Sequence, residues 1–120
     1  MTTWNLQGTV SHLLICNGSD CKKHKGEEVA DAIEDEIEKQ GADSLIHTTV
    51  TRCNGRCSDA CVVISYPEGV WYRDITPKSA KSLVRKVLNG ERLEENVLYT
   101  YDEEGLKAAT HRGAKGKKKK

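Results

Sequence analysis

Five cysteines are the residues of this 120-residue chain whose type and spacing could do chemistry. Cys16 and Cys21 are separated by four residues, Cys53 and Cys57 by three, and Cys61 follows after three more. An odd number of cysteines argues against a closed set of disulfides, and thiols stay reduced in the cytosol. The pattern therefore predicts metal binding or redox chemistry.

The spacing of these thiols favours iron over zinc. Zinc sites usually contain two Cys-x2-Cys pairs, and neither pair here has that spacing. Iron–sulfur clusters are held by four thiolates at more variable intervals, although the pattern also differs from the plant-type ferredoxin run. Short glycine-containing loops at 17–19 and 54–56 adjoin the cysteines, and we expect their backbone N–H groups to reach the sulfurs.

The elements around the cysteines predict how the thiols are brought together. An unbroken apolar run within 10–16 predicts a buried strand, and alternation over 45–52 predicts a second one. Apolar residues at every fourth position between 26 and 40 predict an amphipathic helix between these strands. A strand–helix–strand unit is nearly always a right-handed crossover with parallel strands. The two cysteine pairs should therefore converge at one edge of the sheet, where open α/β sheets hold ligands.

A β-hairpin and a C-terminal helix are expected next. Apolar runs at 62–66 and 70–72 flank a Pro-Glu-Gly turn. An N-cap at Thr76, a proline after it and an Asn-Gly stop delimit a helix over about 77–88. Residues 97–99 could add a strand. The fold class is therefore α/β, with a strand-helix-strand unit followed by the hairpin and the helix.

The net charge of +1 conceals two oppositely charged parts. Residues 107–120 hold seven of the 19 basic residues and none of the 18 acidic ones, so the rest of the chain is acidic. A polar tail of this kind cannot bury enough apolar surface to order itself. The predicted organisation is an N-terminal extension (1–9), a domain (10–90), an extension that could pack on it (91–106) and a disordered basic tail (107–120).

Several classes of protein are not expected from this sequence. No apolar run reaches the 18 or more residues of a membrane span, and the first eight residues lack a basic and then apolar leader, so we expect a cytoplasmic protein. The lysine tail lacks interleaved aromatics and an amphipathic pattern, so we expect neither nucleic-acid nor membrane binding. The chain contains no nucleophile with a base and an orienting group, and no phosphate loop, so we do not expect an enzyme.

Four motifs together resemble the thioredoxin-like [2Fe-2S] ferredoxins and the same fold in the small flavoprotein-associated subunit of complex I and related hydrogenases. They are Leu14-Ile15-Cys16-x4-Cys21, Gly26-Glu27-Glu28, Cys53-Asn54-Gly55-Arg56-Cys57 and Tyr66-Pro67-Glu68-Gly69-Val70-Trp71-Tyr72, spread over about 11–90. The resemblance implies a thioredoxin-like fold, often a homodimer, with a [2Fe-2S] cluster on Cys16, Cys21, Cys53 and Cys57. It also implies a one-electron carrier that serves a reductase and an electron acceptor, and some relatives of this type accompany cobalamin biosynthesis.

Two other functions remain open at this point. One is a zinc-stabilised binding module, and the other is a thiol–disulfide oxidoreductase that uses Cys53 and Cys57, although the chain contains no Cys-x-x-Cys. Cys61 departs from the family pattern, in which proline or another residue is more usual. It is either an alternative iron ligand or a buried free cysteine that opens the third strand, and we favour the buried cysteine. His24 is the one histidine near a cysteine pair, and a histidine ligand is not needed where four cysteines suffice.

Overall fold

The structure is a computed structural model that describes residues 2–109, apart from the side chains of Asp20 and Lys22. Six strands form one mixed sheet in the order β2-β1-β3-β4-β5-β6. The strands are β1 Ser11–Cys16, β2 Ile46–Thr51, β3 Val63–Tyr66, β4 Val70–Tyr72, β5 Val97–Asp102 and β6 Gly105–Ala108. The helices are α1 Ser19–Lys23, α2 Gly26–Lys39 and α3 Pro77–Leu88, with 3-10 turns η1 Cys57–Asp59 and η2 Glu94–Asn96. The predicted α/β fold class, a strand-helix-strand unit followed by a hairpin and a helix, is confirmed.

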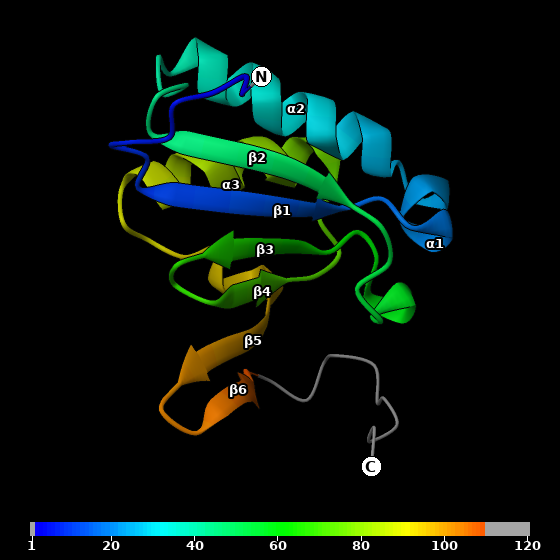
Figure 1. Ribbon diagram of the computed structural model, residues 1–120. Coiled ribbons are helices and arrows are strands. Elements are labelled where there is room, and N and C mark those ends of the chain that lie inside the picture. Colours follow the sequence, from blue (N-terminus) through cyan, green and yellow to red (C-terminus); the bar gives the residue numbers. More distant parts are fainter. Residues whose placement is uncertain (1, 110–120) are drawn as a thin grey trace.

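The β1–α2–β2 unit has the predicted parallel arrangement. Ser11 lies opposite Ile46 and Cys16 lies opposite Thr51, so the two strands end level with each other. Helices α2 and α3 cover one face of the sheet; in Figure 1, α3 lies behind β1 and β2, and α2 runs above β2. Leu13 and Ile33 are fully buried in the core between the sheet and these helices. Truncation of such a side chain to alanine typically lowers the free energy of unfolding by about 2–5 kcal/mol. This core fixes the ends of the two strands from which the cysteine loops start.

Helix α3 begins and ends where its local sequence predicts. The Thr76 hydroxyl accepts a hydrogen bond from the Ser79 N–H at 3.1 Å, and the Ser79 hydroxyl accepts one from the Thr76 N–H at 2.8 Å. Two N–H groups that the helix leaves free are thereby satisfied. At the other end Gly90 takes a φ of +70°, which glycine adopts without a steric penalty.

The C-terminal part of the described chain is more ordered than predicted. The strand expected at 97–99 is the longer β5, and it turns back into β6, which was not predicted. Lys107 and Ala108 pair with Thr100 and Tyr99, so the predicted start of the disordered tail at residue 107 is wrong. The remainder of that tail, residues 110–120, lies outside the described residues.

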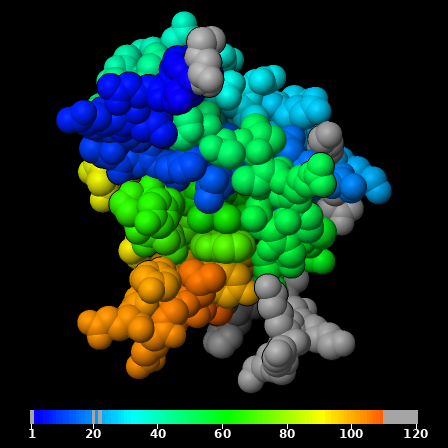
Figure 2. All heavy atoms as spheres, in the orientation of Figure 1, coloured from blue at the N-terminus to red at the C-terminus, as the bar shows by residue number. Residues whose placement is uncertain are grey.

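The second face of the sheet carries aromatic side chains in place of helices. Ile64, Trp71 and Tyr99 lie opposite one another on β3, β4 and β5, and the rings of Trp71 and Tyr99 meet edge to face at 5.9 Å. Figure 2 shows that strand residues form the surface of this face. Within residues 2–109, every helix is too short or too polar to cross a bilayer.

Candidate metal centre

The predicted cysteine pairs lie at the edge of the sheet where β1 and β2 end. Cys16 is the last residue of β1 and Cys21 lies in α1, while Cys53 and Cys57 follow β2 and reach η1. In Figure 1 the arrowheads of β1 and β2 point toward α1 and the green 3-10 turn. The two loops are in direct contact, because a Cβ added to Gly18 would lie only 2.8 Å from the Cβ of Cys53. All these thiols are free.

The thiols form two pairs of different exposure. The sulfurs of Cys53 and Cys57 are 3.3 Å apart, and both residues are exposed. Cys16 and Cys21 are buried, and their thiols hydrogen-bond to each other. Across residues 2–109 no three His, Cys, Asp or Glu side chains surround one point as a single metal ion would require. Two pairs are what a [2Fe-2S] cluster needs, because each of its two irons takes two protein ligands.

Backbone N–H groups point at three of the four sulfurs. The Gly55 N–H donates to the Cys53 sulfur at 3.2 Å, as expected for the glycine-containing loops. The N–H groups of Gly18 and Val62 act to lower the pKa values of Cys16 and Cys21, as Asn54 does for Cys16. The Cys16 thiol itself donates to the Arg52 carbonyl at 3.3 Å. Such donors stabilise negative charge on sulfur. The cradle therefore suits thiolates of the kind that hold an iron–sulfur cluster.

The pKa values of the buried pair follow from these contacts. Burial alone would raise the pKa of Cys16, but the hydrogen bonds from Gly18, Cys21 and Asn54 outweigh it and lower the pKa. Burial raises the pKa of Cys21 to about 12, and the neighbouring Cys16 sulfur adds to the shift. Cys16 therefore ionises before Cys21, and a bound cation is needed to hold both as thiolates.

Cys61 lies behind Cys21, directly before β3. It is almost fully buried, and its thiol is 3.3 Å from the carbonyl oxygen of Cys21 and 3.1 Å from that of His24. Burial, with a smaller effect of the charge on Cys16, raises the pKa of Cys61 to about 11. The neutral thiol therefore joins the end of α1 to the start of β3. His24 contributes its carbonyl to this contact, and its side chain is exposed.

The side-chain contacts of four residues near the site were not predicted from the sequence. The side-chain amide of Asn54 donates to the Thr51 hydroxyl at 2.8 Å, which ties the loop to the end of β2. A guanidinium nitrogen of Arg56 lies 2.6 Å from a carboxylate oxygen of Asp59, and the guanidinium sits over the Tyr99 ring. The composition of the Cys53–Cys57 loop could have suggested the Arg56–Asp59 ion pair. Nothing in the linear sequence indicates that Tyr99, a residue of β5, lies close to this loop.

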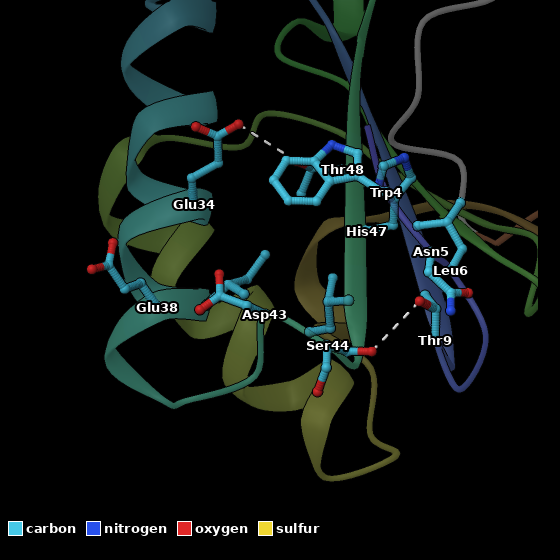
Figure 3. A pocket seen from close by; sticks show the side chains of 12 residues that line it. Trp4, Asn5, Leu6, Thr9, Glu34, Glu38, Asp43, Ser44, His47 and Thr48 are labelled. Atoms are coloured by element: carbon cyan, nitrogen blue, oxygen red, sulfur yellow. Dashed lines mark hydrogen bonds between the residues drawn. The ribbon is translucent and has the colours of Figure 1, made fainter. Parts of the chain in front are cut away.

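A separate groove of about 670 Å³ lies between the N-terminal arm, α2 and the start of β2. Figure 3 shows Trp4 and Leu6 on one side of it and Glu34 on the other, with the Glu34 carboxylate 3.5 Å from the Thr48 hydroxyl. The lining residues of β2 come from its first half, at the end opposite Cys53, and they include no cysteine. The cysteine edge is therefore the candidate site for metal chemistry.

Comparisons of this chain with protein families, curated proteins and solved structures all find [2Fe-2S] ferredoxins. The family model for thioredoxin-like [2Fe-2S] ferredoxins matches residues 3–88. A candidate 2Fe-2S ferredoxin from Priestia megaterium is 48% identical over 107 residues, which cover 88% of this chain and 84% of the relative. A 2Fe-2S ferredoxin from Clostridium pasteurianum is 29% identical over 67% of this chain and 87% of its own length. The solved thioredoxin-like [2Fe-2S] ferredoxin from Aquifex aeolicus superposes with a TM-score of 0.71 at 26% identity, covering 78% of this chain and 94% of that one.

Proposed function

Because this chain belongs to the thioredoxin-like [2Fe-2S] ferredoxin family, we propose that Cys16, Cys21, Cys53 and Cys57 are the four ligands of its cluster. Membership of the family makes the protein an iron–sulfur electron carrier with a [2Fe-2S] cofactor. When bound, the cluster accepts and returns one electron at a time. The observation that supports this ligand set is the meeting of two thiol pairs at one sheet edge, with N–H groups aimed at their sulfurs.

The two pairs have different roles in this proposal. Cys16 and Cys21 are buried beside β3 and anchor the cluster in the protein. Cys53 and Cys57 are exposed, so a redox partner can approach the cluster most closely at their side. The N–H donors to Cys16, Cys21 and Cys53 offset negative charge on the sulfurs and make the reduced form easier to reach. Cys61 stands outside the proposed ligand set, because the other four cysteines already form the two pairs that the cluster needs and Cys61 lies just before β3.

The setting of this electron carrier is also a proposal. Residues 10–90 form the ferredoxin domain, flanked by residues 1–9 and by residues 91–108, which add β5 and β6 to its sheet. The protein passes electrons between a reductase and an acceptor in the cytoplasm, as a homodimer and without a substrate of its own. A biosynthetic route such as that of cobalamin is the pathway that the family resemblance suggests.

Metal and sulfide analysis of the purified protein tests the ligand assignment. We expect about two irons and two sulfides per chain, and an S = 1/2 electron paramagnetic resonance signal after reduction. Serine substitution of each of the four proposed ligands should alter the visible spectrum or abolish it. Stoichiometric zinc in protein made under iron-replete, anaerobic conditions would contradict the proposal and favour a zinc-stabilised binding module.

A further inference from the structure

We propose that Tyr99 of β5 is a positioning residue of the cluster, acting through Arg56 in the loop between Cys53 and Cys57. Arg56 lies with its guanidinium carbon 5.3 Å from the centroid of the Tyr99 ring. This inference rests on the proposed function, since it assumes that Cys53 and Cys57 are ligands. It brings into the site a strand that begins after residue 88, where the match to the family model ends.

The Arg56 side chain is held from two directions. One guanidinium nitrogen is 2.6 Å from a carboxylate oxygen of Asp59, and the two side chains are only 12% and 5% exposed. The Tyr99 ring covers the guanidinium from the sheet. A cation over an aromatic face is attracted by the ring, and the attraction strengthens as water is excluded. Arg56 is therefore fixed in one place although the cysteines on either side of it are exposed.

The Tyr99 ring is itself well anchored. It meets the Trp71 ring edge to face at 5.9 Å, and β5 pairs with β4 on one side and with β6 on the other. A continuous set of contacts thus runs from the sheet through Tyr99 to Arg56. The ring acts as a rigid support, because two packed strands hold its backbone.

The loop that Arg56 occupies needs such a support. Gly55 has a φ of +82°, and glycine allows the backbone more freedom than any other residue. The Gly55 N–H is the donor to the Cys53 sulfur, so movement of Arg56 would carry the neighbouring donor away from that sulfur. Loss of an N–H···S bond disfavours the more negative, reduced cluster. Removal of the Tyr99 ring should therefore lower the midpoint potential of the cluster and increase the access of solvent to the sulfurs of Cys53 and Cys57.

The experiment compares substitutions in the full-length, cluster-loaded protein. Tyr99→Leu removes the aromatic ring, Tyr99→Phe keeps it, and Tyr101→Leu is the matched control on the same strand. Tyr101 points to the same face but is 62% exposed and lies beside Gly69. The measurements are the midpoint potential, the visible circular dichroism and the rate at which an added iron chelator removes the cluster.

We expect Tyr99→Leu to lower the potential and to speed cluster loss roughly two- to thirty-fold, the range between an exposed and a desolvated cation–π contact. Tyr99→Phe and Tyr101→Leu should match the wild type. Wild-type behaviour of Tyr99→Leu would overturn the inference, as would an equal change in Tyr101→Leu. A wild-type protein without iron and sulfide would instead contradict the proposed function, before any variant is compared.

Arg56→Gln alone, with the Tyr99 ring intact, should also lower the midpoint potential, and it keeps the test decisive if Tyr99→Leu folds poorly. A double-mutant cycle then tests whether Tyr99 acts through Arg56. Arg56→Gln removes the cation, and Tyr99→Leu should then add no further shift in potential, because the two residues act through one contact. Additive shifts would mean that Tyr99 affects the cluster by a route other than Arg56, and the inference would be wrong.

Discussion

Gly18 is the position where the smallest change to the chain should most disturb the metal centre. It lies in the loop after β1, and a Cβ added there would be 2.8 Å from the Cβ of Cys53, 2.9 Å from its Cα and 3.0 Å from its nitrogen. Carbon atoms in ordinary contact are about 3.5–4.0 Å apart. Two of the three atoms belong to the backbone, so the clash cannot be relieved by rotating a side chain. Gly18→Ala must therefore push the two ligand loops apart by about 1 Å.

The expected effect is larger on the cluster than on the fold. Overpacking of this kind typically costs about 1–3 kcal/mol of stability, while a metal site tolerates errors in ligand placement of only about 0.5 Å. We expect Gly18→Ala to be purified with less iron than the wild type, to show altered visible circular dichroism, and to lose its cluster faster to a chelator. Urea unfolding of the same samples measures the change in stability.

Gly41→Ala is the matched control for this substitution. Gly41 has a φ of +65° and open space around it, so alanine there costs about 1–2 kcal/mol through the backbone alone. It follows α2 and lies away from the cysteine edge. Iron content and cluster lifetime should stay normal in Gly41→Ala despite the loss of stability. The same iron content and lifetime in both variants would refute the steric argument about Gly18.

Three further predictions follow from the described residues. Cys61→Ser should keep a normal visible spectrum and Cys57→Ser should lose or distort it, and a colourless Cys61→Ser protein would mean that the fourth ligand is wrongly assigned. Burial and then the charge of His47 lower the pKa of His12 from 6.5, so the native protein takes up this proton less readily than the unfolded chain. The free energy of unfolding should hence fall as the pH drops below about 6.5, and a His12→Gln variant with an unchanged pH slope between 7 and 5 would contradict the assignment. Removal of residues 110–120 should leave the absorbance spectrum and midpoint potential unaltered, because all proposed ligands lie between 16 and 57, and a spectral shift would show contact between that segment and the site.

The main elements of the fold could be predicted because their signals are local. The apolar residues of α2 recur at helical spacing, and the ends of α3 are marked by Thr76 and Gly90. The position of the cysteines then followed from topology, since parallel strands joined by a helix must end at the same edge of the sheet. The elements themselves are indicated by residues that are close together in the chain, and one general rule of topology then joins the two strands.

The elements that could not be predicted depend on tertiary contacts. Helix α1, Ser19–Lys23, is too short for its apolar pattern to show a period, and it packs against η1. Strand β6 has a single large apolar side chain, the exposed Leu106, so pairing with β5 decides its conformation. The contacts of Arg56 with Tyr99 and of Cys61 with the Cys21 carbonyl join segments that are far apart in sequence. No local sequence pattern predicts such contacts.

The four-thiol site depends on long-range pairing of β1. The Cys16 N–H donates to the Val62 carbonyl, and Cys16 lies opposite Thr51 on the other side. Both neighbours are remote in sequence, and pairings of this kind form late because the intervening chain must first be closed into loops. A ribosome-bound chain that lacks these partners therefore carries separate thiols with no common site. The complete four-thiol site is therefore available to iron and sulfide only on a chain whose central strands have paired.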